Sequence, residues 1–295
     1  MTIEFTCPHC GKQTKVDEQY AGTSGPCAGC GKTIAIPGTT AAGPPPANPG
    51  GGGLLGLGVA GTVLAVGCAV TGLVVVILIL LLLPAVNAVR EAARRNQCGN
   101  NLRQIGIAMR SYEDRYRSLP PAYIADANGT PMHSWRVLIL PFLEHQALYD
   151  EYDFSQPWDS PKNLAVAAQM PEVYRCPSTG FLASDETSYM VVAGPGMAFD
   201  GSRGMRQREF ADGITNTILV VESADHVTWT QPVDLEARQM MFQVNGGPGE
   251  IGSDHGGGVA MVVFADGHLN ALSEDTPPEA VRAMCTRAGK ERIDY

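Results

Sequence analysis

Four cysteines near the N-terminus have the spacing of a metal site. They form two C-x2-C pairs, Cys7 with Cys10 and Cys27 with Cys30, and residues 11–26 separate the pairs. Each pair can form a knuckle, and four thiolates complete the tetrahedral coordination of structural zinc. Four protein ligands leave no position for water, so the pattern predicts a structural zinc ion rather than a catalytic one. We expect a zinc ribbon over residues 1–37.

The other cysteines, Cys68, Cys98, Cys176 and Cys285, are scattered. Cys98 follows an arginine cluster on an expected helix, and Cys176 ends an expected strand. Two interpretations stay open for this pair, either buried free thiols or a disulfide, and the disulfide requires an oxidising compartment. We expect the Cys98–Cys176 disulfide, with Cys68 and Cys285 simply packed.

Six acids and histidines in the second half of the chain could form a metal or acid–base cluster: Glu222, His226, Asp254, His255, Asp266 and His268. No HExxH, GxSxG or P-loop motif accompanies them. Asp-Gly at 266–267 is an ordinary turn dipeptide. We expect turns and solvated side chains, and no enzyme. The alternative is an envelope hydrolase or metal-dependent enzyme that uses Asp254, His255, Asp266 and Glu222, which a convergent, accessible cluster with a pocket would favour.

Two segments after the cysteine module predict a membrane anchor. Residues 38–53 read GTTAAGPPPANPGGGG, a Pro/Gly-rich linker. Residues 54–83 contain no charge and end in VVVILILLLL. About 20 apolar residues span a bilayer, so one transmembrane helix fits and two do not. A buried core helix is the alternative interpretation.

Helical periodicity continues beyond the apolar segment. Val89, Leu102, Ile105 and Met109 recur at roughly helical spacing, so we expect the helix to pass Pro84, with a kink there, and to stop before the LPP at 119–121. Further elements are expected from apolar runs between turn residues: helices at 135–149 and 277–288, and strands at 173–175, 189–192, 217–221 and 259–264.

The charge distribution argues against nucleic acid as a partner. The net charge is −9, residues 1–50 hold three lysines and three acids, and no charge lies between Lys32 and Arg90. The negative charge therefore belongs to the part after residue 89, whereas nucleic-acid phosphates select Lys and Arg.

Several short motifs in order resemble the domain-of-unknown-function 1559 family of pilin-like (type II secretion pseudopilin-like) bacterial proteins. They are LLLLPAV at 80–86, REAARR at 90–95, QC at 97–98, NNLRQIG at 100–106, LPP at 119–121, RCPS at 175–178, DGITNT at 212–217, VVE at 220–222, HGG at 255–257 and FADG at 264–267. The resemblance covers about residues 78–295. The ribbon, the linker and a different apolar segment stand where the family usually has a basic leader and a Phe-Thr-Leu-x-Glu motif.

The resemblance implies an α+β fold, in which the outer half of a long N-terminal helix packs on an antiparallel sheet over residues 84–295. It implies a membrane-anchored structural or interaction protein, with the zinc ribbon as a handle. Other envelope or pilin-like proteins are the expected partners, and no small-molecule ligand is indicated. A transmembrane sensor, in which the outer domain binds a ligand, is a third interpretation.

Two arguments about topology conflict. Basic residues usually stay in the cytoplasm, and Arg90, Arg94 and Arg95 follow the apolar segment, which favours a cytoplasmic large domain. Thiolate chemistry favours the reverse, because zinc thiolates suit a reducing compartment and a disulfide an oxidising one. The resemblance agrees with the thiol argument. We expect a single-pass protein of the bacterial inner membrane, with a cytoplasmic N-terminus and an extracytoplasmic C-terminal domain.

Overall fold

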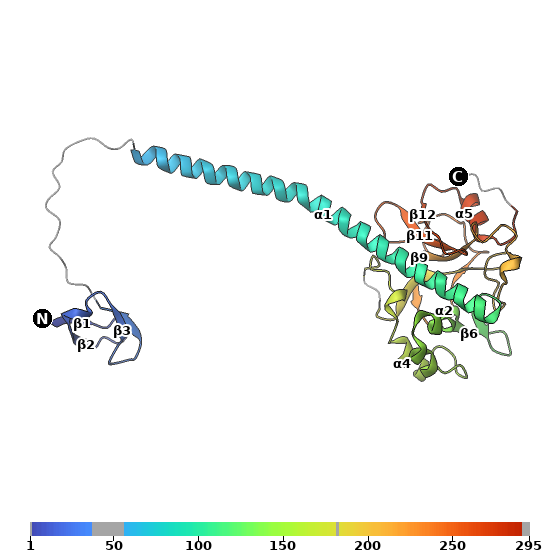
Figure 1. Ribbon diagram of the computed structural model, residues 1–295, viewed down its shortest axis with the longest axis horizontal. Coiled ribbons are helices and arrows are strands. Elements are labelled where there is room, and N and C mark those ends of the chain that lie inside the picture. The colour runs from blue at the N-terminus through green and yellow to red at the C-terminus, as the bar shows by residue number, and fades with distance from the viewer. Residues whose placement is uncertain (1, 37–55, 181–182, 291–295) are drawn as a thin grey trace. The chain divides into compact units, whose positions relative to one another are not determined.

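The computed structural model describes residues 2–36, 56–180 and 183–290, and the chain divides into two compact units, 1–72 and 73–295. Figure 1 shows their elements. The linker predicted at 38–53, and the start of the predicted span at 54–55, lie outside the described residues.

The first unit is built from two antiparallel hairpins. Strand β1 (Thr2–Thr6) pairs with β2 (Gln13–Asp17), and β3 (Ser24–Pro26) pairs with β4 (Thr33–Ala35). A short 3-10 helix, η1 (Glu18–Tyr20), follows β2. Each hairpin connection carries one of the cysteine pairs, so the fold brings the two pairs together.

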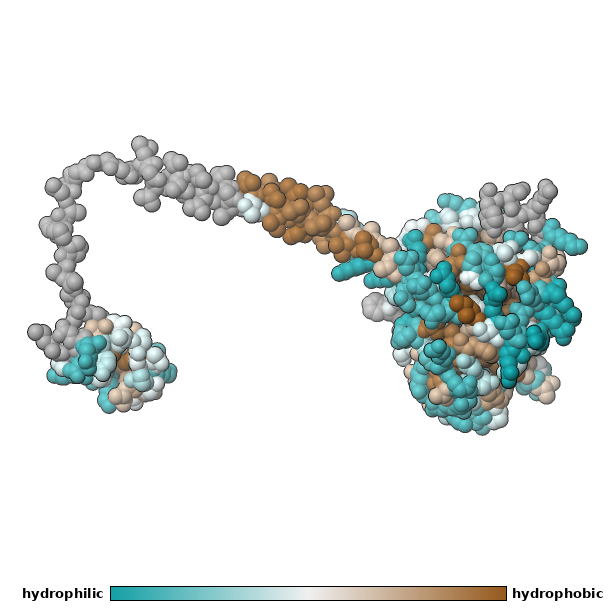
Figure 2. Space-filling view, in the orientation of Figure 1, coloured by the Kyte–Doolittle hydropathy of each residue, from teal (hydrophilic) through white to brown (hydrophobic). Residues whose placement is uncertain are grey.

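Helix α1 (Gly56–Tyr116) is continuous through Pro84, so the expected extension past that residue is confirmed. Side chains from 70 to 83 are all exposed, although they are Val, Ile and Leu with few exceptions. Figure 2 shows them as an apolar band around the helix. Among the described residues, one helix, over Val70–Tyr116, is long and apolar enough to cross a membrane. A helix satisfies its own backbone groups, which is what a lipid environment requires.

The second unit centres on a four-stranded antiparallel sheet in the order β12-β11-β9-β7. Its strands are β7 (Glu186–Met190), β9 (Ile218–Thr228), β11 (Val259–Phe264) and β12 (Leu269–Ser273). Successive side chains of β11 point to opposite faces of the sheet and so belong to two different hydrophobic cores. Val263 belongs to the core that includes α1, whereas Ala260, Val262 and Phe264 belong to the core that includes α5 (Pro278–Cys285). The α+β fold, with the long helix packed on an antiparallel sheet, is confirmed.

Close packing joins α1 to the sheet. Its apolar stripe, including Leu102, Ile105 and Met109, is fully buried. Gly106 lets the helix approach β11, because a Cβ atom there would lie 3.0 Å from Cγ2 of Val263. This stripe is the one predicted from helical spacing.

Shorter elements lie between α1 and β7. A hairpin of β5 (Tyr123–Ala125) and β6 (Pro131–Ser134) precedes α2 (Trp135–Leu138), η2 (Leu140–Leu143), α3 (Gln146–Glu151), α4 (Pro161–Ala167) and η3 (Glu172–Tyr174). After β7, strand β8 (Val192–Ala193) pairs in parallel with β10 (Leu235–Glu236), and η4 (Gln207–Glu209) lies between them in sequence.

Two predicted elements are corrected. The helix expected at 135–149 is broken into α2, η2 and α3, because Pro141 lacks a backbone N–H and Glu144 adopts a left-handed conformation with φ 65°. The strand expected at 173–175 is wrong. Pro171 starts a 3-10 turn there, in which the N–H groups of Tyr174 and Arg175 bond to carbonyls three residues back.

Candidate functional sites

The four N-terminal cysteines converge. All four Sγ atoms lie within 4.8 Å of one another, with 3.9 Å between Cys7 and Cys30 and 3.8 Å between Cys10 and Cys27. Two sulfurs on one tetrahedral zinc, each about 2.3 Å from the metal, are about 3.8 Å apart. The sulfur positions therefore fit a tetrathiolate metal site.

Local sequence explains why the sulfurs point inward. Both connections repeat the pattern Cys-x-x-Cys-Gly-Lys, and each makes the same two backbone bonds, from the first cysteine to the lysine carbonyl and from the glycine back to the first cysteine. Gly11 and Gly31 have φ values of 68° and 70°, a left-handed conformation that glycine adopts without strain. The two knuckles thus have one geometry.

Backbone amides favour thiolate at this site. The N–H of Gly29 donates to Sγ of Cys27 at 3.3 Å. This bond, with one from the N–H of Cys30, lowers the pKa of the Cys27 thiol to about 6. A backbone bond at Lys12 lowers the pKa of the Cys10 thiol, but the contacts of that thiol with the neighbouring thiols outweigh this bond and raise its pKa to about 11. Metals bind the thiolate form, so Cys27 is the donor that the backbone prepares for a cation that accepts sulfur ligands.

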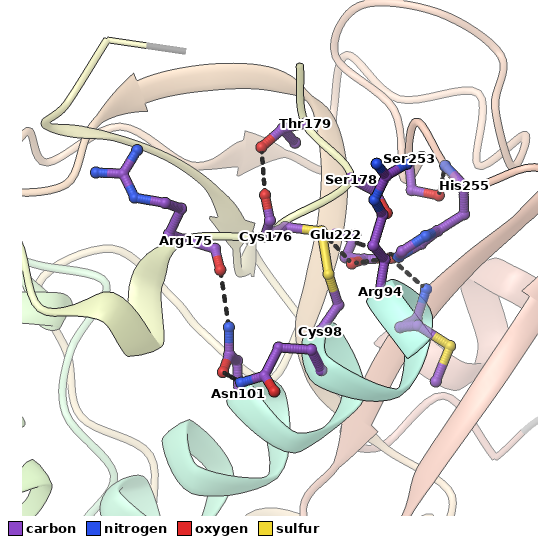
Figure 3. The surroundings of a disulfide bond; sticks show 12 residues. Arg94, Cys98, Asn101, Arg175, Cys176, Ser178, Thr179, Glu222, Ser253 and His255 are labelled. Carbon is purple, nitrogen blue, oxygen red and sulfur yellow. Dashed lines mark hydrogen bonds and ion pairs between the residues drawn. A yellow bond between two sulfur atoms is a disulfide. The ribbon is translucent and has the colours of Figure 1, made fainter. Parts of the chain in front are cut away.

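A second group of reactive side chains lies within the second unit, where α1 packs on the rest of that unit. Cys98 of α1 and Cys176 form a disulfide with 5.2 Å between Cα atoms, as the sequence predicted. Figure 3 shows that Glu222 and His255 lie beside this bond. Sγ of Cys176 is 3.4 Å from Oε1 of Glu222 and 3.9 Å from Nε2 of His255.

His255 is held between two carboxylates. Its Nδ1 is 2.8 Å from Oε1 of Glu91 on α1, and its Nε2 is 3.2 Å from Oε1 of Glu222 on β9. Both nitrogens face acceptors, so the doubly protonated imidazolium satisfies both contacts. Arg94 lies 3.6 Å from the other oxygen of Glu91 and offsets part of the negative charge. His255 is 4% exposed, so these contacts form in a largely dry environment.

The pKa shifts of this group follow from that geometry. Burial by itself lowers the pKa of His255, but Glu222 and Glu91 outweigh burial, and the pKa lies above its ordinary 6.5. Burial raises the pKa of Glu91, but the bond and charge of His255 bring the net value below 4.5. The His255 contribution to stability is therefore complete below pH 6.5 and is lost as pH rises through its raised pKa. The Glu91 contribution is present above pH 4.5 and is lost as pH falls through its lowered pKa.

The predicted cluster of acids and histidines is only partly assembled. Glu222 and His255 meet, whereas Asp254 is exposed. The carboxylate of Asp266 contacts the N–H and ring of His268 on its own turn, and that ring stacks on Phe264. The convergent site that the hydrolase alternative required from Asp254, His255, Asp266 and Glu222 is therefore not brought together as a set. Besides Glu222, the residues that contact His255 are Glu91 and Cys176, which the sequence analysis had not placed there.

Of the two remaining cysteines, Cys68 and Cys285, the structure describes the side chain of Cys285. Cys285 is 1% exposed in the core beside α5, and burial raises the pKa of its thiol to about 12. This agrees with the expectation that it is simply packed. The side chain of Cys68 lies outside the described part of the chain.

A buried ion pair also escaped sequence analysis. Arg136 and Asp234 are joined at 2.8 Å, with side-chain exposures of 0% and 5%. Asp234 also accepts hydrogen bonds from the indole of Trp135 and the N–H of Val191. The guanidinium donates to the carbonyl of Tyr189 on β7. This network fixes α2 against the sheet. The partners are 98 residues apart in sequence, and no motif links them.

Residues 87–194 match the family described as protein of unknown function (DUF1559). Over these residues the match agrees with the family resemblance found in the sequence, and it includes Glu91, Cys98 and Cys176. Comparisons of the chain with curated proteins and with solved structures gave no match.

Proposed function

We propose that this chain, which carries the DUF1559 segment at residues 87–194, is a pilin-like structural or interaction protein of the bacterial inner membrane. It acts without catalysis and uses the N-terminal module as a cytoplasmic zinc-ribbon handle. The supporting observation is the change of environment along α1. Side chains from 70 to 83 are apolar and exposed, whereas Cys98, Leu102 and Ile105 of the same helix are fully buried. Exposed apolar surface of this extent is costly in water and favourable in lipid.

The tetrathiolate geometry supports the zinc-ribbon assignment. Four cysteine ligands at tetrahedral spacing fill every coordination position, which suits a structural ion and not a catalytic one. The ribbon would present a rigid surface of two hairpins to a protein partner. Zinc would supply most of the folding energy of a module whose core, among the side chains that the structure describes, consists of Cys7, Cys27 and Ile34.

The absence of catalysis is supported by the burial of the second cluster. His255 is 4% exposed and Glu222 is 1% exposed, and both are engaged with each other. A general acid or base must reach a substrate. Asp254 and Asp266, the other members of the hydrolase alternative, face elsewhere.

The orientation follows from thiol chemistry. The Cys98–Cys176 disulfide is stable in an oxidising compartment, and the tetrathiolate module in a reducing one. The arginines after the apolar segment favour the opposite orientation. We place the disulfide domain outside the cytoplasm because a disulfide of this kind would not persist inside.

Two measurements test this topology. A reporter that is active only outside the cytoplasm, fused after Tyr295, should be active. In intact cells, a membrane-impermeant maleimide should label Glu172→Cys but not Lys15→Cys, relative to the unsubstituted chain. The two positions are matched because their side chains are 89% and 70% exposed. A silent reporter with labelling at Lys15→Cys alone would invert the proposal.

A further inference from the structure

The two cysteines of the disulfide belong to a group of four side chains that could each bind a metal ion. Cys98 comes from α1, Cys176 from the segment before β7, Glu222 from β9 and His255 from the segment before β11. One donor atom from each lies within 4.8 Å of all the others, and all four residues are buried. Two cysteines, one histidine and one carboxylate are a ligand set that zinc accepts.

The spacing of three of these donors matches a coordination tetrahedron. With bonds of about 2.3 Å to sulfur and about 2.0–2.2 Å to nitrogen and oxygen, tetrahedral edges are about 3.3 Å between nitrogen and oxygen and about 3.6 Å from sulfur to either. The observed distances are 3.2 Å between His255 Nε2 and Glu222 Oε1, 3.4 Å from Cys176 Sγ to Glu222, and 3.9 Å from Cys176 Sγ to His255. The two sulfurs are bonded to each other and must separate to about 3.8 Å before both can be ligands of one tetrahedral ion.

Groups around the donors hold them in this arrangement. Glu91 contacts Nδ1 of His255 at 2.8 Å and leaves Nε2 directed at the other donors. The second oxygen of Glu222 accepts the backbone N–H of Met261 at 2.8 Å. A carboxylate behind a ligating histidine, and a backbone donor behind a ligating carboxylate, are the outer contacts that orient ligands in metal sites.

We propose that the reduced form of this protein binds one zinc ion through Cys98, Cys176, Glu222 and His255, at a site separate from the N-terminal tetrathiolate. A dithiol or phosphine reductant supplies two electrons, and the disulfide with two protons becomes two thiols. Zinc binding then releases both thiol protons and the Nε2 proton of His255, while Nδ1 keeps its proton toward Glu91. Disulfide and metal are mutually exclusive, but each ties α1 to the same segment before β7. The link between the helix and the sheet therefore persists in both redox states.

The experiment uses the full chain in detergent, with Cys7, Cys10, Cys27 and Cys30 replaced by serine so that the first site cannot bind. Phosphine-reduced, anaerobic protein is titrated with Co²⁺ as a spectroscopic substitute for zinc, followed by competition with Zn²⁺. One equivalent should give thiolate-to-cobalt charge transfer and tetrahedral d–d bands, and Zn²⁺ should remove both. The same protein with its disulfide intact should bind at least a hundredfold more weakly.

Variants distinguish cobalt binding at the proposed site from nonspecific binding to thiols. His255→Ala and Glu222→Gln should each weaken binding at least tenfold and alter the d–d bands, and Glu91→Gln should weaken it about 10- to 100-fold, as outer-shell changes do. His268→Ala, an exposed histidine of the same unit, should leave binding unchanged. Circular dichroism of the oxidised variants checks that each is folded. The proposal is overturned if the reduced chain binds no cobalt at micromolar concentration, if the oxidised chain binds equally well, or if folded His255→Ala gives the native spectrum.

Discussion

Replacing Cys98 and Cys176 together by alanine should remove a loop-closure contribution of about 4.5 kcal/mol from the free energy of unfolding of the second unit. The bond closes a loop with a sequence separation of 78. For a loop of that size, the chain-entropy model gives a loss of about 15 cal/mol/K in the unfolded state, which is about 4.5 kcal/mol at 25 °C. In this model the bond stabilises the fold mainly by restricting the unfolded chain. Its removal should therefore leave the native contacts of α1 in place.

The packing of the sulfur atoms needs its own control. Both cysteines are buried, and each truncation also leaves a small cavity, at about 1 kcal/mol per site. Cys285 is equally buried but closes no loop within the described structure. Cys285→Ala therefore measures the truncation cost alone.

Denaturant unfolding of the full chain in detergent provides the assay. Tryptophan fluorescence reports on the second unit alone, because Trp135, Trp158 and Trp229 all lie in it. In thermal unfolding, the loss of loop closure should lower the melting temperature by about 9–18 °C beyond the truncation cost, at about 2–4 °C for each kcal/mol in a domain of this size. A double variant that loses no more than twice the Cys285→Ala cost would refute the loop-entropy reasoning.

Three further tests concern charged and metal-binding side chains. Because the pKa of His255 is raised above 6.5, unfolding free energy should fall as pH rises from about 6 to 8, and His255→Gln should flatten that slope; equal slopes would contradict the imidazolium contact. Cys27→Ser should unfold the first unit and abolish stoichiometric zinc binding there, seen by circular dichroism and metal analysis of the purified chain; an unchanged fold in chelator would argue against zinc. Arg136→Met leaves the carboxylate of Asp234 buried without its cation and should cost about 3–5 kcal/mol in denaturant unfolding, whereas the double variant Arg136→Met/Asp234→Leu should recover much of that loss. No recovery would mean that the cost is packing, not charge.

Features carried by local pattern could be predicted from the sequence. Each C-x2-C pair lies within one short hairpin connection. The positions of its two sulfurs therefore depend on few backbone angles and can be predicted from local sequence. The apolar stripe of Leu102, Ile105 and Met109 follows from helical period alone. Strand 259–264 was predicted with its observed bounds, because Asp-Gly and Gly-Gly turns delimit a short run of apolar residues.

Features set by long-range pairing could not be predicted from pattern. Glu91 and His255 are 164 residues apart, and each looks like an ordinary polar residue in its own segment. Asp254 and Asp266 were grouped with His255 because they lie near it in sequence, but neighbours along a turn point in different directions. The sequence interpretation of Val173 and Tyr174 as a strand failed for a related reason. A short apolar run does not distinguish a strand from a 3-10 turn, and Pro171 selects the turn.

The order of contacts along α1 carries a mechanical consequence. Glu91, Arg95 and Cys98 are spaced i, i+4, i+7, so they continue the face that buries Leu102 and Ile105 toward the exposed apolar segment of α1. These first three positions make directional contacts: the ion pair to His255, a hydrogen bond to the carbonyl of Gly256, and the disulfide. The later positions make apolar contacts, which are not directional. A force that tilts the exposed part of α1 acts first on the contacts nearest to that part. If those contacts were only apolar, the helix could slide along the sheet. The ion pair of Glu91 is the contact nearest to the exposed part of the helix, and the disulfide of Cys98 lies about two turns further along α1. The covalent bond therefore resists separation of the helix from the sheet at this end.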